Sequence, residues 1–372
     1  DSSNGEQRLC NLFGVTSLAG YGSFGRAELA AMGALVDYLD LTQRGNLPLL
    51  TPPQQENPAG LVQIDASTRR NLEITSALSG GRDGSLIAAV DRTLTSAGGR
   101  LLERRLSAPS RDLSLVKRRL AAVRHFVDHP RLRAEMRDDL RRVPDIDRAL
   151  SRLALDRGGP RDVAAIRAGL VAAAGMAMRV PDGAPDLLTS AAMQLLGHDA
   201  LIDLLEAALV AEPPLLTRDG GFVAAGYDPE LDETRQLRDE GRGVIATMQA
   251  EFADLTGISS LKIKHNNVLG YFVDVTSTHS EKMLSPPLSE TFIHRQTTAG
   301  QVRFTTVKLS EMETRILNAG NHALEIEKRH YATLKSAIMA EAARISGTAR
   351  ALAEIDIATA FADLAVTDDW AE

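Results

Sequence analysis

The hydrophobic pattern of this chain changes its period twice. Apolar residues recur every three or four positions up to about residue 256 and again beyond residue 307, as on one face of an amphipathic helix. Between these stretches the period is two, with Tyr271, Val273 and Val275 alternating with Phe272 and Asp274. Because helices and strands need different periods to keep one face apolar, we predict a mainly α protein in which two long helices carry a small β unit.

The first long helix has clear start and stop signals. Asp228 can cap a helix N-terminus, and Gly257 can end a helix by adopting the left-handed conformation. We therefore predict a helix that starts after Asp228 and runs to about Thr256. Gly241 and Gly243 lie in its middle and should weaken it by about 1 kcal/mol each.

The second long helix is predicted after the β unit, where no proline occurs from Lys308 to the end of the chain. Its apolar stripe resembles that of a coiled coil, with intervals of three and four residues. This stripe predicts a long helix that returns antiparallel to the first one. The residues of the stripe are Leu334, Ile338, Ala342, Ile345, Ala349 and Leu352.

The β unit is expected to begin with a hairpin. Leu261 and Ile263 alternate with lysines, and Asn266-Asn267 can form a tight turn because Asn tolerates left-handed backbone. Residues 271–276 then form the returning strand. A loop and two more strand candidates follow at 277–290, 291–295 and 301–306.

The rest of the chain is expected to be helical. One helix is predicted from about Arg26 to Thr42, ended by Gly45 and Pro48. From residue 61 to 212, prolines separate successive apolar stretches of helical period, and a helix boundary at each proline costs little. These prolines are Pro109, Pro130, Pro144, Pro160, Pro181, Pro185 and the Pro213-Pro214 pair that closes the region.

The β unit is basic within an acidic chain. The whole sequence carries a net charge of −7, whereas residues 257–310 hold six Lys or Arg against three Asp or Glu, a net charge of +3. Basic and polar side chains at strand ends can bind phosphate oxygens without reading bases. A solvated hairpin face is the alternative interpretation, and composition alone leaves both open.

Motifs for catalysis, nucleotides and metals are weak or missing. The G-x-G-x-x-G pattern at residues 20–25 follows a poor strand candidate, and no second strand comes after it, so we interpret it as a turn without a ligand. No Gly-Lys pair occurs, which excludes a P-loop within this chain. His125 and His129 have helical spacing but no third ligand nearby, which favours a solvated helix end. We therefore predict no catalytic, cofactor-binding or metal-binding residues.

The compartment is expected to be a reducing cytoplasm. Cys10 is the only cysteine and cannot form an internal disulfide. No apolar run reaches the ~18 residues of a membrane span, and the polar N-terminus lacks the pattern of a secretory signal. The sequence begins without Met, so we expect it to be an excised piece of a longer protein.

Several stretches of the chain resemble the MutS family of DNA mismatch-repair proteins. Their order and spacing match across nearly the whole chain, although Ser96 and Ala97 stand where the family usually has Pro-Met. The matching stretches are Ala66–Ile74, Asp91–Thr95, Gly98–Leu102, Gly226–Glu233, Ser260–Lys262, Gly270–Phe272, Arg295–Thr297 and Ala353–Asp356.

The resemblance implies the central part of a MutS-type protein. Residues 1–47 would be the C-terminal part of the connector domain, a short α/β remnant. Residues 48–242 and 307–372 would form the helical core with its lever helices. Residues 243–306 would be the clamp domain, a small β-rich domain inserted between the levers.

The resemblance also implies a DNA-binding role for the clamp. MutS proteins encircle DNA as dimers, and their clamp holds the duplex backbone without sequence preference. Matching positions then give seven expected phosphate contacts: Lys262, Lys264, Asn266, Asn267, Arg295, Gln296 and Arg303.

Two informative MutS modules are expected to be missing. No Phe is followed two residues later by Glu, so the mismatch-wedging motif is absent, and the ATPase domain would start after Glu372. We therefore expect no enzyme activity and no cofactor in this chain. ATP and Mg would bind the ATPase domain of the longer protein from which the chain derives, here called the parent. The chain would couple nucleotide state to clamp position through rigid helices.

The resemblance further implies partners and a location. The partners would be double-stranded DNA, a MutL-type repair protein and, through the ATPase domain, a second copy of the parent. The fragment itself would be monomeric, have no membrane partner, and belong to a bacterial cytoplasm with nucleoid association when bound to DNA.

A different class of function stays open at this point. The chain could be a helical interaction scaffold whose clamp-like hairpin docks a protein partner. Salt dependence distinguishes the two functions, because about three engaged phosphates should give a slope near −3 for log affinity against log salt.

Overall fold

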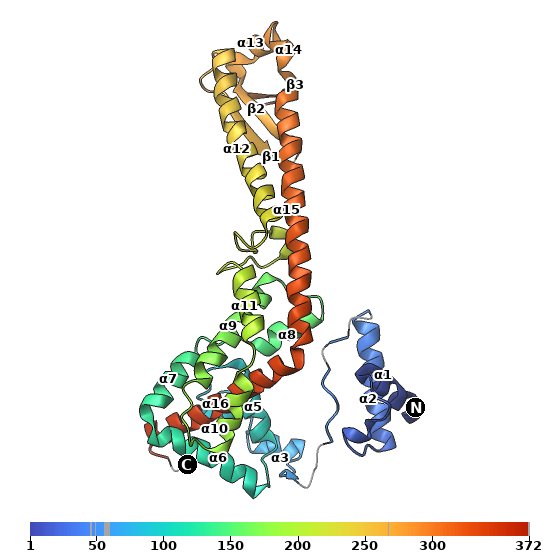
Figure 1. The fold of residues 1–372 in the computed structure, drawn as a ribbon, viewed down its shortest axis with the longest axis vertical. Helices are drawn as coiled ribbons and strands as arrows, with labels where there is room; N and C mark the ends of the chain where they lie inside the picture. Colours follow the sequence, from blue (N-terminus) through green and yellow to red (C-terminus); the bar gives the residue numbers. More distant parts are fainter. Residues whose placement is uncertain (45–46, 49, 56–59, 267, 371–372) are drawn as a thin grey trace. The chain divides into compact units, whose positions relative to one another are not determined.

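The computed structural model describes residues 1–44, 47–48, 50–55, 60–266 and 268–370. The described chain is mainly helical and contains a four-stranded antiparallel sheet (Figure 1). It forms two compact units: unit 1 comprises Asp1–Leu216 and Thr333–Glu372, and unit 2 comprises Thr217–Ala332. The mainly α fold with a small β insertion is confirmed, whereas the three predicted domains and their boundaries stay a prediction.

Unit 2 is built on two long helices. α12 covers Pro229–Thr256, and the Asp228 carboxylate accepts hydrogen bonds from two backbone N–H groups of the first turn at 2.8 and 3.3 Å. Gly257 ends this helix with a φ of 62°. Both ends therefore lie where the capping residues predicted them. α15 covers Val307–Ala340 and continues from unit 2 into unit 1.

α12 and the first part of α15 run antiparallel, as predicted. Glu251 pairs with Lys308 at 2.8 Å, and Glu327 pairs with Arg235 at 2.8 Å. Residue numbers therefore rise along one helix as they fall along the other.

Gly241 has a packing role in this helix pair. A Cβ atom at Gly241 would lie 2.6 Å from Ile316 Cγ1, so the glycine makes room for α15. Gly243, two residues later, has no such neighbour within 4 Å. Close helix packing therefore compensates for the low helix propensity of glycine at Gly241 but not at Gly243.

The β unit is an antiparallel sheet with strand order β1-β2-β4-β3. Ile263 lies opposite Val273, which lies opposite Phe304, so these side chains share one face, here called the inner face. The inner face packs on α12 and α15 in one buried cluster with Phe252 and Leu309. The strands are β1 Lys262–Asn266, β2 Gly270–Thr276, β3 Ile293–Thr298 and β4 Gln301–Thr305.

The connection from β2 to β3 is helical and not the predicted loop. Met283 and Leu288 are only 0% and 9% exposed and join the same core as the sheet. The short helices direct these two apolar side chains into the core. A prediction based on the polar residues and prolines of this stretch overlooked them. The elements are η4 Ser277–His279, α13 Ser280–Leu284 and α14 Leu288–Thr291.

The turn between β1 and β2 is longer than the tight turn predicted. Asn266 ends β1, and its Oδ1 accepts hydrogen bonds from the backbone N–H groups of Val268 and Leu269 at 2.9 and 2.8 Å. β2 starts only at Gly270. Asn267, the second half of the predicted turn, lies outside the described residues.

Unit 1 is organised around α16, Ala342–Thr367, which is buried on most of its sides. Ile355, Asp356 and Thr359 are each 0% exposed. Helices separated by the predicted prolines surround it, which confirms the all-helical module. The helices between residues 60 and 216 are α3 Ala66–Asn71, α4 Leu86–Val90, α5 Ser96–Ser107, α6 Leu113–Asp128, α7 Pro130–Leu140, α8 Ile146–Ala154, α9 Pro160–Ala177, α10 Asp186–Leu195 and α11 Asp199–Ala208.

The long C-terminal helix is broken, which the sequence did not predict. Glu341, with φ −100° and ψ 9°, separates α15 from α16. Its carboxylate accepts a hydrogen bond from His198 Nδ1 at 3.0 Å, and Arg344 lies 3.4 Å away. These tertiary contacts hold the break in a sequence that has neither Pro nor Gly there, while Ile338 and Ala342 on either side stay buried as predicted.

The N-terminal segment is helical in its described part. It consists of α1 Ser2–Phe13, η1 Leu18–Gly20 and α2 Arg26–Thr42, and no strand occurs among residues 1–44. The α/β character expected for this remnant is therefore not found in those residues. The G-x-G-x-x-G stretch begins at the last residue of η1 and not after a strand, so it lacks the βαβ context of a dinucleotide loop.

Candidate nucleic-acid interface

The register of the sheet places several predicted contacts together on the face opposite the helices, here called the outer face. Lys262 lies opposite Asp274, and Asp274 lies opposite Arg303 on the next strand. Arg303 in turn lies opposite Gln296. Because directly opposite residues point to the same side of a sheet, these side chains share the outer face. Lys264, two residues from Lys262, shares it too.

Asp274 lies at the centre of the outer face. Its side chain is only 3% exposed, and Lys264 Nζ donates to its Oδ2 at 2.6 Å. Arg303 Nε lies 3.6 Å from Oδ1, within ion-pair distance but too far for a hydrogen bond. The Gln301 amide, with its nitrogen turned toward the carboxylate, lies 2.5 and 2.9 Å from the two oxygens. The acid is thus enclosed by side chains from β1 and β4.

Arg303 has further partners on the same face. Its guanidinium carbon lies 4.7 Å from the centroid of the Phe272 ring, and Nη1 donates to Gln296 Oε1 at 2.8 Å. Gln296 therefore supports Arg303 through its side-chain oxygen. The Arg303 side chain keeps 25% of its surface exposed.

Lys262 and Arg295 are the expected cations that have no partner of their own. Both side chains are exposed, and neither makes an ion pair or hydrogen bond with another residue that the structure describes. Arg295 sits at a β-bulge, where the pairing with β4 shifts between His294 and Gln296. Because a bulge redirects the side chain that it displaces, Arg295 is not constrained by a cross-strand neighbour.

The two asparagines of the expected set differ in status. Asn266 Oδ1 is occupied by the two backbone N–H groups of the turn, so this atom has a structural role. Asn267 is outside the described residues. The structure therefore brings five of the expected residues to one sheet, while their phosphate contacts stay a prediction. The five residues are Lys262, Lys264, Arg295, Gln296 and Arg303.

Three groups that matter to this region were missed by the sequence reasoning. Asp274 entered the prediction from sequence only through the charge count. Its alternation with Val273 and Val275 already indicated that it points away from the apolar face, as the lysines of the hairpin do. Gln249 of α12 accepts from the Ile263 N–H at 2.8 Å, and Glu313 of α15 accepts from the Tyr271 N–H at 3.2 Å. No local sequence signal could have revealed these two long-range contacts.

Gly270 is required by one of these contacts. Its φ is +68°, and a Cβ atom there would collide with the Glu313 carboxylate. Glycine is therefore needed both for the backbone conformation and for the approach of α15 to the hairpin.

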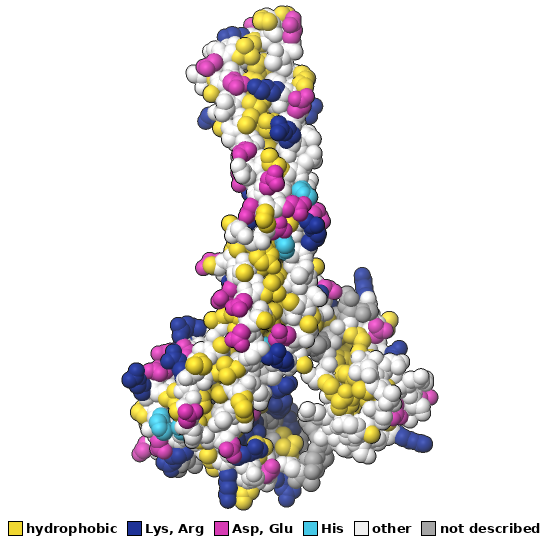
Figure 2. Space-filling view, in the orientation of Figure 1, with side chains coloured by type: hydrophobic (Ala, Val, Ile, Leu, Met, Phe, Trp, Pro, Cys, Tyr) yellow, Lys and Arg dark blue, Asp and Glu magenta, His cyan; other side chains and the backbone are white. Residues whose placement is uncertain are grey.

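The charges elsewhere on unit 2 are mixed. Figure 2 shows basic and acidic side chains interspersed over the visible face of this unit, without a continuous basic surface. Several are ion pairs, including Arg329 with Glu230 at 3.3 Å and Lys308 with Glu251 at 2.8 Å. Many of the cations on the helices of unit 2 are therefore paired with acids, although Lys282 and Arg315 are not paired with any described residue.

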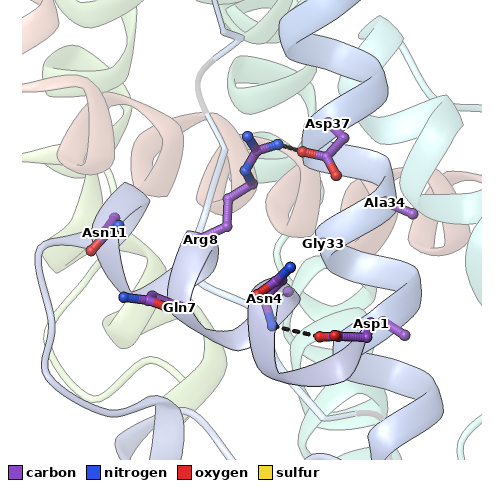
Figure 3. Close-up of a pocket in the computed structure, with 10 residues that line it drawn as sticks. Asp1, Asn4, Gln7, Arg8, Asn11, Gly33, Ala34 and Asp37 are labelled. Atoms are coloured by element: carbon purple, nitrogen blue, oxygen red, sulfur yellow. Dashed lines mark hydrogen bonds and ion pairs between the residues drawn. The ribbon is translucent and has the colours of Figure 1, made fainter.

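A hollow of about 530 Å³ between α1 and α2 is a weaker candidate site. Figure 3 shows Arg8 turned toward Asp37, with which it forms an ion pair, and the Asn4 backbone N–H donating to the Asp1 carboxylate. The charged side chains of this hollow, Arg8, Asp37 and Asp1, thus already have partners within it.

Metal sites and membrane spans have no support in the part of the chain that the structure describes. Among the described residues, no group of three or more His, Cys, Asp or Glu side chains could hold a metal ion. The His125 and His129 rings stack with centroids 4.2 Å apart, and His129 Nδ1 lies 2.7 Å from the His125 carbonyl oxygen. Within the same described residues, no helix is long and apolar enough to cross a bilayer.

Unit 1 brings two of the matching sequence stretches into direct contact. Asp356 of α16 accepts hydrogen bonds from the Leu94 and Thr95 N–H groups at 2.9 and 2.8 Å, and from the Thr95 hydroxyl at 2.6 Å. Burial raises the pKa of the Asp356 carboxyl, against these hydrogen bonds, which lower it. A Cβ atom at Gly98 would collide with the carboxylate. Residues about 260 positions apart thus form one enclosed polar cluster.

Known proteins match this chain over its whole length. A family model described as MutS domain III matches residues 67–362. Proteins described as DNA mismatch repair protein MutS are 70% identical over 372 residues in Cereibacter sphaeroides, 65% over 371 in Roseobacter denitrificans and 64% over 370 in Paracoccus denitrificans. Each alignment includes 100% of this chain but 42% of the relative, so the chain spans less than half the length of these relatives.

Proposed function

Because the chain belongs to the MutS family of DNA mismatch-repair proteins, we propose that unit 2 holds the backbone of duplex DNA against its sheet. The parent protein would act in mismatch repair, and this part of it would grip DNA without reading sequence. The observation that carries the proposal is the cluster of cations on and beside the outer face. Cations on a sheet can bind phosphate oxygens of both strands irrespective of base identity.

The geometry ranks the proposed phosphate contacts. Lys262 and Arg295 come first, because both are exposed and have no described partner. Lys264 and Arg303 come next, since Asp274 holds them but leaves other donors available. Gln296, like Asn266 and Asn267, would contribute polar contacts at most.

Coupling between the helices and the clamp is the second part of the proposal. α15 contributes residues to both units, and its Glu313 holds the backbone of β2. Gln249 of α12 holds the backbone of β1 in the same way. A shift of either helix would therefore move the hairpin that carries Lys262 and Lys264. Helix angles that do not differ between ATP-free and ATP-bound parent protein would contradict this coupling.

The remaining parts of the parent would supply the chemistry. We propose that this chain has no enzyme activity of its own, and that ATP and Mg bind an ATPase domain outside it. That domain would also provide the dimer contact, leaving this piece monomeric. A MutL-type protein would be a further partner, in a bacterial cytoplasm with association to the nucleoid.

The main test compares two charge reversals of equal size. The double substitution Lys262→Glu with Arg295→Glu should weaken binding of a labelled duplex at low salt by at least about tenfold. It should also reduce the slope of log affinity against log salt by about 1.8, for two lost phosphate contacts. Wild-type binding should itself be weak, because a single clamp lacks its dimer mate. Fluorescence anisotropy over a salt series gives both quantities.

The matched control is Lys282→Glu with Arg315→Glu. Both residues are exposed cations of unit 2, but they lie on α13 and α15 and not on the sheet. The net charge change is identical, so the control should retain most of the affinity. Equal losses in the two variants would mean that overall charge, and not the sheet, binds DNA.

A protein-docking scaffold is the second candidate function. It is favoured by β3, Ile293–Thr298, which forms one edge of the sheet and is exposed at nearly every position. An extended peptide could pair with such an edge through backbone hydrogen bonds. Wild-type protein that shows no salt-dependent DNA binding would favour this scaffold.

A further inference from the structure

We propose that Asp274 is the positioning residue of the outer face: it fixes Lys264 and Arg303 so that their remaining donors meet phosphate oxygens. This inference rests on the proposed DNA binding and names the group that organises it. It assigns to an acid a favourable effect on the binding of a polyanion.

The arrangement of the three side chains supports this role. Asp274 is on β2, Lys264 on β1 and Arg303 on β4, so the acid lies between the two cations. It is 3% exposed, whereas Lys264 keeps 47% and Arg303 25% of the side-chain surface exposed. A phosphate approaching the sheet from solvent would therefore meet the cations first and the acid last.

Both cations keep donors for a ligand. An ammonium group has three N–H donors, and Lys264 directs one of them to Asp274 at 2.6 Å. A guanidinium group has five, and Arg303 directs one to Gln296 at 2.8 Å while Nε faces Asp274. Holding Asp274 thus uses only part of the hydrogen-bonding capacity of each cation.

Preorganisation explains how an acid can strengthen binding here. Free Lys and Arg side chains lose rotamer freedom when they grip a phosphate, and that loss opposes binding. Asp274 and the Phe272 ring, 4.7 Å from the Arg303 guanidinium, restrict these side chains before the ligand arrives. The smaller entropy loss on binding then outweighs the repulsion from one buried negative charge.

A consideration of charge alone predicts the opposite result. Removing Asp274's charge would make the outer face more positive by one, which should tighten DNA binding and steepen its salt dependence. The sign of the change therefore separates the two explanations without reference to its size.

The experiment measures duplex binding by the full chain carrying Asp274→Asn over a salt series. The expected result is at least about threefold weaker binding with a salt slope shallower by about 1, because the two cations no longer hold their positions. The control is Glu281→Gln, which removes an equal charge from an exposed position on α13. That control should bind slightly more tightly than wild type.

A second variant keeps the test valid if Asp274→Asn fails to fold. Arg303→Lys leaves the charge unchanged but removes the fork that reaches both Asp274 and Gln296. It should also weaken binding, with far-UV circular dichroism like that of the wild type. Unchanged or tighter binding by Asp274→Asn, or by Arg303→Lys where that is the variant used, overturns the positioning role while leaving DNA binding intact. Wild-type protein without salt-dependent DNA binding would overturn both this inference and the proposed function.

Discussion

Each unit of the molecule buries an aspartate, and the two are held by different kinds of partner. Asp356 in unit 1 is 0% exposed and accepts from backbone N–H groups and a hydroxyl. The Asp274 side chain in unit 2 is 3% exposed and is held by two cations that themselves reach solvent and by the Gln301 amide. Removing Asp356 would leave the part-buried Leu94 and Thr95 donors without their acceptor, whereas the more exposed cations around Asp274 can become hydrated. We therefore expect Asp356 to contribute mainly to the stability of the fold, and Asp274 mainly to the positions of the cations on the outer face.

The largest expected effect is on stability. Asp356→Ala should lower the free energy of unfolding of unit 1 by about 3 kcal/mol, because two backbone N–H groups and a hydroxyl lose their shared acceptor. Asp274→Ala should lower that of unit 2 by about 1 kcal/mol or less, since Lys264 and Arg303 can turn to water. Native-state hydrogen exchange of amides in α5 and in the sheet reports on each unit separately.

These two substitutions test directly whether the two acids have different roles. Equal losses of protection in the two units would mean that Asp274 is as structural as Asp356. The distinction drawn from their partners would then be lost, and with it the reason to expect that Asp274→Asn folds.

A smaller effect is expected from two neighbouring glycines in α5. Gly98→Ala should lower the free energy of unfolding by about 2 kcal/mol, because its Cβ has no room beside the Asp356 carboxylate. Gly99 meets only the Thr93 hydroxyl, at an ordinary 3.5 Å, so Gly99→Ala should be neutral or stabilise by up to about 1 kcal/mol. Urea unfolding measures both. Similar effects at the two positions would show that the Asp356 cluster can relax, and would weaken the contrast with unit 2.

The smallest expected effect is a pH dependence that belongs to Asp356. Burial raises the pKa of this carboxyl above its ordinary value of 3.8, so the folded chain keeps a proton that the unfolded chain has already lost. The stability contributed by this proton is fully present below about 3.8 and falls as pH rises through the folded-state pKa. Asp356→Asn cannot titrate. The stability of the wild type relative to Asp356→Asn should therefore decline across that range, and a constant difference would contradict an enclosed, proton-holding acid.

Local signals in the sequence were sufficient for much of the fold. Asp228 and Gly257 defined both ends of α12, because helix caps act through residues adjacent in sequence. The alternation around Val273 identified the sheet for the same reason. The break at Glu341 could not be predicted, since its partner His198 is 143 residues away and no Pro or Gly marks the position.

The candidate site was predictable in its composition but not in its organisation. Lys262, Lys264 and Arg303 were identified as cations of a basic β unit. The register that places Asp274 between two of them depends on strand pairing between Asp274 and Arg303, which are 29 positions apart, and a single sequence does not reveal it. The bulge at Arg295 was equally hidden, because bulges leave no reliable residue pattern.

The ion pair between Glu251 and Lys308 has a consequence for how such a protein can change over evolution. The Glu251 carboxylate and the Lys308 ammonium group lie 2.8 Å apart. The β unit therefore leaves the pair of helices and rejoins it at nearly the same point. An insertion with adjacent ends closes a loop whose entropic cost grows only slowly with length. The β unit could therefore be exchanged, enlarged or replaced by a short turn while the helices beneath it keep their packing.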